Sequence, residues 1–327
     1  MKALVAARLG MPPEMMVQDR PMPRIQPNQS LVRMHAATIN PLSSYVRQGE
    51  IATATSPLVL SNDGAGTIEQ SSRFTPGTRV AIYGGGELGI TEDGLQQQWV
   101  VVDDKRLIVL PATLSLDEGA ALPINYVTAH QAITRVGKLK RGQTVLIPGA
   151  TGALGYALVQ TATALGATVI AVVSNANKAA HAQSLGLSSV IDLSQCELIE
   201  TVMSRTDGQG VDLAFDPVGG AMLGLLVRAL RQRGAVVSIG FAGGGRAEFD
   251  VIDLVVHEKR ILGYDAHLES EADADHALTE VQRLAEAGYL RPVIDSTYTF
   301  DNFEDGYRRL ASRQAMGALL LRVDTKS

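Results

Sequence analysis

The sequence predicts an α/β protein in which a doubly wound parallel sheet is joined to a separate β-rich domain. Three observations favour this class. An apolar run at 144–148 leads into three evenly spaced glycines, apolar strands alternate with helical segments from about residue 120, and residues 1–118 carry short β-type runs between turns. A chain of 327 residues is long for one hydrophobic core, so two domains are expected. We predict an α/β domain at 119–264 and a β-rich domain made of 1–118 and 265–327.

The β-rich domain is predicted from short strand-forming runs with turn residues between them. The runs lie at 31–35, 79–83 and 99–102, and the turns at Pro76-Gly77, Gly84–Gly86 and Asp93-Gly94. This pattern is typical of a barrel-like domain. A helix is expected near 303–313, followed by an apolar strand at 318–323. Because so apolar a last strand needs a partner sheet, we expect the chain after about residue 264 to rejoin this domain, which leaves a cleft at the carboxyl ends of the parallel strands.

The α/β domain is predicted from six apolar strands at the spacing of repeated strand–helix units. The strands are expected at 145–147, 168–173, 189–192, 211–215, 235–239 and 260–263. Between them, apolar faces recur with helical period, as in Leu154, Leu158, Thr161 and Leu165, and again in Leu223, Leu226 and Leu230. These faces are packing surfaces, and six such strands complete a doubly wound sheet.

Composition excludes several function classes. The formal charge is −5, and no basic cluster marks a surface for nucleic acid or for anionic membranes. No stretch approaches the roughly 18 apolar residues of a membrane helix, and the first residues read as a strand with no signal peptide, so the cytoplasm is the expected compartment. A single cysteine, Cys196, and six histidines without metal-binding spacing predict no disulfide and no metal site.

The three glycines predict a dinucleotide-binding turn. Gly149 permits a tight turn, Gly152 lets backbone N–H groups approach a pyrophosphate, and Gly155 lets the following helix pack close to the sheet. The helix N-terminus then offers unpaired donors and a positive dipole end to the anion. Glycine-rich turns also occur in ordinary loops, but the second strand begins about 20 residues further on, as in a Rossmann domain.

The residues after the second strand favour NADPH over NADH. An NAD site usually places Asp or Glu there to bind the ribose hydroxyls, whereas this chain reads Ser174-Asn175-Ala176-Asn177-Lys178. No carboxylate repels a 2′-phosphate, Ser174 and Asn175 can donate hydrogen bonds, and Lys178 can supply a positive charge. The alternative for Lys178 is an ordinary solvated helix residue.

A series of motifs then extends along the whole chain. In order, these are Ile39-Asn40-Pro41, Tyr45-Val46-Arg47-Gln48-Gly49, Asp63-Gly64-Ala65-Gly66, Pro76–Val80, Thr128-Ala129-His130, Gly149–Gly155, Asp216–Gly220, and Ser312-Arg313 before Gly317. Together they resemble the medium-chain dehydrogenase/reductase superfamily, in its zinc-free quinone oxidoreductase branch, which includes zeta-crystallin. The resemblance implies a Rossmann domain, a β-rich GroES-like catalytic domain, and a homodimer that pairs through the strand beginning at Arg260.

Zinc alcohol dehydrogenases of this superfamily carry metal ligands that this chain lacks. Asn62 stands where the metal-binding His would be, and the four-cysteine lobe is missing. Without a Lewis acid, alcohol oxidation loses much of its transition-state stabilisation. Hydride delivery to an acceptor that is already electrophilic remains, so quinones, enones and enals fit.

The resemblance also implies which residues form the site. Asn40 and Tyr45 would lie beside the nicotinamide or the substrate as the catalytic residues, with the Tyr45 phenol as the candidate proton donor. The residues implied to contact the cofactor are Asn40, Tyr45, Thr128, Thr151, Gly152, Ala153, Leu154, Gly155, Ser174, Lys178, Ser238, Gly240, Phe241, Tyr264 and Arg313. For Tyr45, Tyr264 and Phe241 the alternative is ordinary aromatic packing.

The sequence therefore predicts an NADPH-dependent, zinc-independent oxidoreductase that transfers a hydride to a quinone or an α,β-unsaturated carbonyl. One alternative is a non-catalytic NADPH-binding protein, as among crystallin relatives, because an intact pyrophosphate turn does not separate binding from turnover. Another is a trans-2-enoyl thioester reductase, which has a tyrosine just after the Gln-Gly of the same loop. This chain reads Gln48-Gly49-Glu50-Ile51 and lacks that acid. The acceptor is expected to depend on the loops at 84–94 and 241–246.

Overall fold

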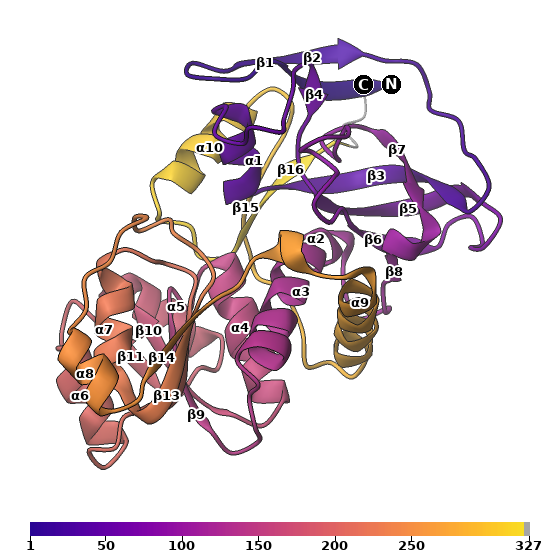
Figure 1. Cartoon of the computed structure of the whole chain (residues 1–327). Helices are drawn as coiled ribbons and strands as arrows, with labels where there is room; N and C mark the ends of the chain where they lie inside the picture. Colours follow the sequence, from indigo (N-terminus) through magenta and orange to yellow (C-terminus); the bar gives the residue numbers. More distant parts are fainter. Residues whose placement is uncertain (324–327) are drawn as a thin grey trace. The chain divides into compact units, whose positions relative to one another are not determined.

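The computed structural model describes residues 1–323 and divides the chain into two units (Figure 1). The α/β unit comprises residues 126–269, and the β-rich unit comprises residues 1–125 together with those from 270 onward. Helix α3 (Pro123–Gln131) contains the first junction between them. One unit is built on a parallel sheet and the other on mixed and antiparallel sheets, which confirms the predicted fold class.

The α/β unit holds a six-stranded parallel sheet in the order β11-β10-β9-β12-β13-β14. Its strands are β9 (Thr144–Pro148), β10 (Thr168–Val173), β11 (Val190–Asp192), β12 (Val211–Asp216), β13 (Leu230–Ser238) and β14 (Arg260–Gly263). Strands β9 and β10 are buried, continuous apolar runs, as expected of strands covered on both faces, and the sequence predicted both. Strand β13 begins at Leu230, before the predicted 235–239, because its first half contains the exposed residues Arg231, Gln232 and Arg233 and has no apolar signal. The strand order reverses between β9 and β12, and in doubly wound sheets ligands bind at the carboxyl ends of strands beside such a switch point.

Helices and short helical turns connect these strands. They are η2 (Ala132–Val136, a π-helical turn), α4 (Ala153–Ala164), α5 (Ala176–Ser184), α6 (Leu198–Arg205), α7 (Ala221–Ala229), α8 (Val251–Val256) and η3 (Ala266–Leu268). The alanine-rich sequence of α4 has high helix propensity, and its face at Leu158 and Thr161 is buried as predicted. Gly166 follows the helix with a φ of 85°, the left-handed conformation that terminates helices.

The β-rich unit contains two sheets. The larger has the order β15-β16-β3-β5-β6-β8, with β7 also paired to β3, and the smaller has the order β2-β1-β4. Their strands are β1 (Lys2–Arg8), β2 (Glu14–Asp19), β3 (Gln29–Ile39), β4 (Leu58–Val59), β5 (Asp63–Ser71), β6 (Arg79–Tyr83), β7 (Trp99–Asp103), β8 (Leu107–Val109), β15 (Ile294–Tyr298) and β16 (Ala318–Arg322). The apolar last strand, β16, lies between β15 and β3, where Leu319 is opposite Ile39.

The helices of this unit are short except for α9. They are α1 (Pro41–Arg47), η1 (Asp104–Arg106), α2 (Leu116–Ala120), α9 (Glu271–Glu286) and α10 (Phe303–Ala311). The last of these ends two residues before the boundary that the sequence predicted, and Arg313 follows it with a φ of 57°. Among residues 1–323 the structure contains no helix that is both long and apolar enough to cross a membrane.

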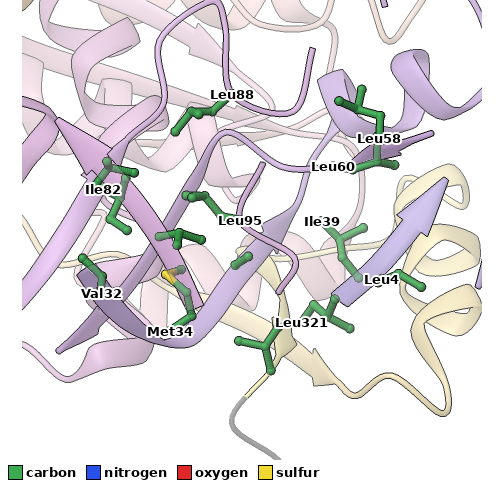
Figure 2. Close-up of a cluster of buried hydrophobic side chains, with 14 of the residues drawn as sticks. Leu4, Val32, Met34, Ile39, Leu58, Leu60, Ile82, Leu88, Leu95 and Leu321 are labelled. Atoms are coloured by element: carbon green, nitrogen blue, oxygen red, sulfur yellow. The ribbon is translucent and has the colours of Figure 1, made fainter. Parts of the chain in front are cut away.

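Figure 2 shows the hydrophobic core of the β-rich unit. Leu4 from β1, Met34 from β3 and Leu321 from β16 are all at most 1% exposed, so segments from both ends of the chain share one core. The same core contains Ile39, the last residue of β3. Strand β3 is therefore held along its length, and its end fixes the position of Asn40, the first residue after it.

Candidate functional site

The glycines of the turn between β9 and α4 stand where a side chain would be strained or crowded. Gly149 has a φ of 62°, which favours glycine, and a Cβ on Gly155 would collide with the Gly149 carbonyl oxygen. A Cβ on Gly152 would lie 3.3 Å from the same oxygen. Gly152 is also the N-cap of α4 and brings no capping side chain, so the first N–H groups of this helix are available to an anion. The turn therefore fits a pyrophosphate.

The loops that follow β12 and β13 pack beside this turn. A Cβ on Gly219, where φ is 73°, would lie 2.8 Å from the carbonyl oxygen of Gly240. The backbone N–H of Gly243 donates to the carbonyl oxygen of Val218 at 2.6 Å, and a Cβ on Gly149 would be 3.2 Å from a methyl group of Val218. The loops that follow β9, β12 and β13 thus meet at the carboxyl edge of the sheet, and their backbones approach so closely that glycine is needed at the contacts.

Asp216 holds the β12 loop from inside. It is fully buried at the end of β12, and its Oδ1 accepts hydrogen bonds from the N–H groups of Val218 and Gly219, both at 2.9 Å. Its Oδ2 is buried without a hydrogen-bond partner in the described part of the chain. Burial raises the pKa of this carboxyl, against the lowering effect of the two backbone bonds. The sequence analysis did not include Asp216 among the site residues, although a lone carboxylate ending an apolar strand was a usable signal.

Most of the residues expected to contact the cofactor lie at this edge. Thr151, Gly152, Ala153, Leu154 and Gly155 form the glycine turn and the start of α4, Ser174 and Lys178 lie at the start of α5, Ser238, Gly240 and Phe241 lie at the end of β13, and Tyr264 follows β14. The backbone N–H of Tyr264 donates to the carbonyl oxygen of Ser238 at 3.0 Å, which joins the last two groups. Thr128 lies on α3. Their roles as cofactor ligands stay predictions.

The segment at the start of α5 is ordered by Asn175. Its Oδ1 caps the helix by accepting the backbone N–H of Lys178 at 3.0 Å, and its Nδ2 donates to the Ser174 hydroxyl at 3.4 Å. The amide oxygen therefore caps the helix, and the same turn carries the Ser174 hydroxyl and the Lys178 ammonium.

The two aromatic residues of this unit differ in their surroundings. Phe241 is 59% exposed, so it does not serve as a core residue here. The ring of Tyr264 has the Arg135 guanidinium 5.7 Å from its centroid, and its hydroxyl donates to the Glu269 carboxylate. Both the ring and the hydroxyl group of Tyr264 therefore have a partner.

Three predicted residues belong to the β-rich unit. Asn40 is the N-cap of α1, where its Oδ1 accepts the backbone N–H of Ser43 at 2.8 Å. Tyr45 lies on the same helix, and burial followed by the charge of Glu50 raises its pKa, while the charge of Arg313 lowers it. The structure therefore brings Tyr45 and Arg313 into electrostatic range, and the phenol keeps its proton at neutral pH.

A buried polar group that the sequence analysis missed surrounds the amide of Asn40. This Asn40 cluster consists of Thr38, Asn40, Ser61, Asn62 and Asp63. The Nδ2 of Asn40 lies 3.0 Å from Oδ1 of Asn62, 3.2 Å from Oδ1 of Asp63 and 3.2 Å from the Thr38 hydroxyl. Thr38 also donates to Asp63 and lies 3.3 Å from the Ser61 hydroxyl. Apart from Asn40, every member is at most 4% exposed.

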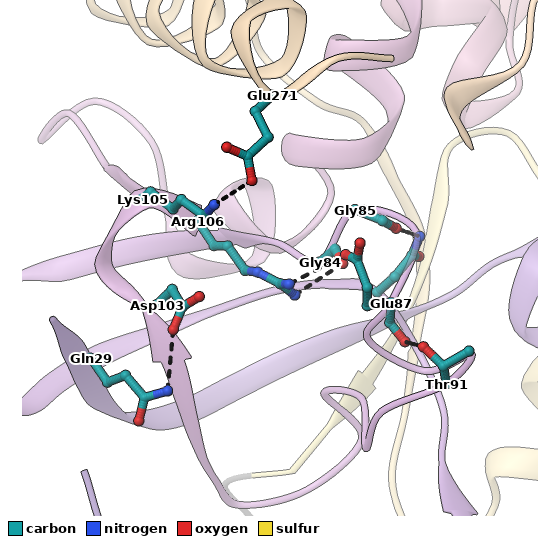
Figure 3. Close-up of polar contacts among 10 residues, drawn as sticks. Gln29, Gly84, Gly85, Glu87, Thr91, Asp103, Lys105, Arg106 and Glu271 are labelled. Atoms are coloured by element: carbon teal, nitrogen blue, oxygen red, sulfur yellow. Dashed lines mark hydrogen bonds and ion pairs between the residues drawn. The ribbon is translucent and has the colours of Figure 1, made fainter. Parts of the chain in front are cut away.

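The loop at 84–94, on which acceptor choice was expected to depend, rests on this cluster. The backbone N–H of Gly84 donates to the carbonyl oxygen of Asn62 at 2.7 Å. In return, Nδ2 of Asn62 donates to the carbonyl oxygen of Gly85 at 3.2 Å. Arg106 also holds this loop: it donates to the Gly84 carbonyl oxygen at 3.3 Å and to the Glu87 carboxylate at 3.2 Å, as Figure 3 shows. A cavity of about 490 Å³ in this unit is lined by residues 20–23, by Leu88 and Asp93 of this loop and by β7, but by none of the predicted catalytic or cofactor-binding residues.

Among residues 1–323, no three His, Cys, Asp or Glu side chains come together in a group that could hold a metal ion. Asn62, at the position where zinc relatives are expected to carry a His, bonds to Asn40 and Gly85 through its amide.

Comparison with known proteins identifies the family. A family model described as "Alcohol dehydrogenase GroES-like domain" matches residues 26–112, and one described as "Zinc-binding dehydrogenase" matches residues 153–308. The chain is 25% identical over 316 residues to a quinone oxidoreductase of Pongo abelii, covering 95% of this chain and 94% of that protein. The chain belongs to the medium-chain dehydrogenase/reductase superfamily, in its quinone oxidoreductase branch.

Other members of the superfamily have similar sequences and folds. The chain is 28% identical to a 2-haloacrylate reductase of Burkholderia sp, over 90% of this chain and 91% of that protein. It is 27% identical to a synaptic vesicle membrane protein VAT-1 homolog of Danio rerio, of which it spans only 66%. Among solved structures, an NAD-dependent alcohol dehydrogenase matches with a TM-score of 0.89 at 25% identity, over 99% of this chain and all of that chain. A Pseudomonas syringae quinone oxidoreductase matches with a TM-score of 0.83 at 25% identity, over 98% of this chain and 99% of that chain. This superfamily member is therefore an oxidoreductase that uses a pyridine nucleotide.

Proposed function

We propose that this protein is an NADPH-dependent reductase of quinones or α,β-unsaturated carbonyls that works without a metal. The observation that carries the proposal is the glycine turn at 149–155, in which a Cβ on Gly155 would collide with the Gly149 carbonyl oxygen and the N-terminus of α4 has no capping side chain, so that it is open to a pyrophosphate. The segment at 174–178 supports the phosphorylated cofactor, because it offers a hydroxyl and an ammonium and contains no carboxylate.

The bound cofactor supplies the hydride, and the chain's own residues supply binding and position. Backbone N–H groups of the turn would hold the pyrophosphate, and Ser174 with Lys178 would hold the 2′-phosphate. In the β-rich unit, Asn40 and Tyr45 are the proposed catalytic residues. Tyr45 retains its proton because burial raises its pKa, so its phenol can donate a proton to the reduced product.

Two relatives support the acceptor class by name. One is called quinone oxidoreductase and another 2-haloacrylate reductase, and both names describe acceptors in which a carbon–carbon double bond is conjugated to a carbonyl or carboxyl group. Such acceptors accept hydride without a Lewis acid, and the amide of Asn62 supports chemistry of this kind because it is a poor zinc ligand.

The test is the oxidation of NADPH, followed by its near-ultraviolet absorbance, with a small quinone and a small enone as acceptors. We expect turnover of at least one acceptor, faster with NADPH than with NADH, and unchanged after treatment with a zinc chelator. Tight NADPH binding without turnover of any acceptor would instead favour a non-catalytic nucleotide-binding protein. Stoichiometric zinc on elemental analysis would contradict the metal-free proposal.

A further inference from the structure

Asp63 is an ionisable side chain to which the proposed chemistry assigns no role. It begins β5 and is 1% exposed. Its Oδ1 accepts hydrogen bonds from Thr38 and Asn40, whereas its Oδ2 is buried with no hydrogen-bond partner in the described chain. A buried carboxylate with one oxygen unpaired is costly to ionise. Burial therefore raises the pKa of Asp63 to about 7, against the lowering effect of bonds from Thr38, Asn40 and the Ile124 backbone.

The amide of Asn40 has more acceptors than hydrogens. Its two Nδ2 hydrogens face Oδ1 of Asn62, Oδ1 of Asp63 and the Thr38 hydroxyl, at 3.0, 3.2 and 3.2 Å. An ionised carboxylate is the stronger acceptor and a neutral carboxyl the weaker one. The amide does not escape this competition by turning over, because its Oδ1 caps α1 through Ser43. The charge of Asp63 therefore decides where the Asn40 hydrogens point.

We propose that Asp63 is a positioning residue, whose charge state selects the hydrogen-bonding pattern of Asn40 and Asn62 and so decides whether Asn40 is fixed in one arrangement. The catalytic part of this inference rests on the proposed function. Ionised Asp63 holds the hydrogens of Thr38 and Asn40, and the arrangement of the Asn40 cluster is then fixed. Protonated Asp63 loosens that hold, and Asn40 shifts toward Thr38 and Asn62. The ionised form is the productive one.

Within residues 1–323, no neighbouring charge shifts the pKa of Asp63, which is shifted by burial and hydrogen bonds alone. The titratable groups on the elements that surround Asp63 are Arg33 and His35 on β3, Arg79 and Tyr83 on β6, Asp117 and Glu118 on α2, and Tyr45 and Arg47 on α1. His35 lies 3.1 Å from Asp117, and Arg79 donates to two backbone carbonyl oxygens at 2.8 Å. The titration of Asp63 is accordingly governed by its burial and its hydrogen bonds.

The pH profile of the reduction tests this role. We expect kcat/KM for the acceptor in the wild type, divided by that of Asp63→Asn, to rise about tenfold from pH 6 to pH 8, because ionisation of a group with a pKa near 7 spans that interval. Asp104→Asn is the matched control: it removes another buried carboxylate of the same unit that accepts from a hydroxyl, that of Ser30. This control should follow the wild type, and the NADPH dissociation constant should have the same pH dependence in all three proteins. Identical profiles of kcat/KM in the wild type and Asp63→Asn would overturn the inference.

A second variant and a second measurement separate this inference from the proposed function. Thr38→Val removes a donor to Asp63, so the break in the pH profile should move to higher pH, and an unmoved break would overturn the inference. Independently of turnover, the side-chain amide resonances of Asn40 should shift with a midpoint near pH 7 in the wild type and stay constant in Asp63→Asn. Resonances that do not respond in the wild type would refute the inference whatever the activity. Responsive resonances in a protein that reduces no acceptor would support the inference and contradict the proposed function.

Discussion

The guanidinium of Arg47 lies over the ring of Tyr307, 4.1 Å from its centroid. The same group donates to both carboxylate oxygens of Glu304, at 3.0 and 2.9 Å. Arg47 is the last residue of α1, and its two partners lie on α10, so one side chain joins these two helices. Figure 1 shows α1 beside α10, although they come from distant parts of the sequence. Through Arg47, the helix that carries Tyr45 is held against the helix that leads to Arg313.

Replacing Arg47 by Met should destabilise the β-rich unit. The side chain is 7% exposed, and its removal deletes a cation–π contact and leaves the Glu304 carboxylate without its cation. We expect the free energy of unfolding in urea to fall by about 2–3 kcal/mol. Arg8→Met is the control, because the ion pair of Arg8 with Glu14 is more than half exposed and should be worth less than about 1 kcal/mol. Equal losses in both variants would contradict this account.

Gly155→Ala should weaken nucleotide binding. The added methyl group would collide with the carbonyl oxygen of Gly149, which must then move away from the position that shapes the turn. We expect NADPH affinity, measured by fluorescence titration, to fall by more than about tenfold. Gly245→Ala is the matched control, since nothing lies within 4 Å of a Cβ there and its φ is not in the left-handed region. Unchanged affinity in Gly155→Ala would show that the turn does not contact the nucleotide.

Lys178→Ala should discriminate between the two cofactors. The loss of its ammonium should weaken NADPH binding by about 1–3 kcal/mol, the range for a hydrogen bond to a charged group, and have much less effect on NADH. Lys140→Ala, which removes an exposed lysine from another loop of the same unit, should change neither dissociation constant. Equal losses for NADPH and NADH in Lys178→Ala would mean that this residue does not contact the 2′-phosphate.

The sequence predicts the α/β unit better than the polar residues of the β-rich unit, for a physical reason. Buried strands such as β9 and β10 are continuous apolar runs, and the turn at Gly149 has a positive φ that favours glycine, a residue visible in the sequence itself. The Asn40 cluster has no such local signal. The cluster exists because β3 and β5 pair with Ala37 opposite Gly64, which places Thr38 beside Asp63. The register of two strands that are distant in the sequence cannot be predicted from either strand alone. Strand β4, with two residues, is likewise too short for any periodicity.

The outer face of the α/β unit should pair two copies of this chain. In the described chain, β14 pairs with β13 alone and so ends the sheet, and Val251, Ile252, Val255 and Val256 of α8 are each more than 60% exposed. An unpaired strand edge beside exposed apolar side chains favours self-association. We expect light scattering to give the mass of a dimer, and Ile252→Glu combined with Val255→Glu to give that of a monomer. Leu268→Glu, which is 77% exposed elsewhere on the unit, should stay dimeric. A monomeric wild type would refute this.

Asp63 should also make the stability of the folded protein depend on pH. The folded protein keeps this proton up to a pKa of about 7, whereas the ordinary value for the unfolded chain is 3.8. Between these values the native state binds one proton more than the unfolded state. The contribution of Asp63 to the free energy of unfolding is therefore complete below about pH 4 and is lost as the pH rises toward 7.

Comparison with Asp63→Asn isolates this contribution, because the amide does not titrate. The free energy of unfolding of Asp63→Asn, minus that of the wild type, should increase by up to about 1.4 kcal/mol per pH unit between pH 4 and pH 7 and level off above that range. The offset between the two proteins also contains altered hydrogen bonds to Thr38 and Asn40, but those bonds do not produce this slope. Denaturation in urea at several pH values measures it, with Asp104→Asn as the control for a generic loss of buried charge. A difference that stays constant from pH 4 to pH 8 would show that Asp63 is ionised throughout, and that the charge of the Asn40 cluster is fixed at neutral pH.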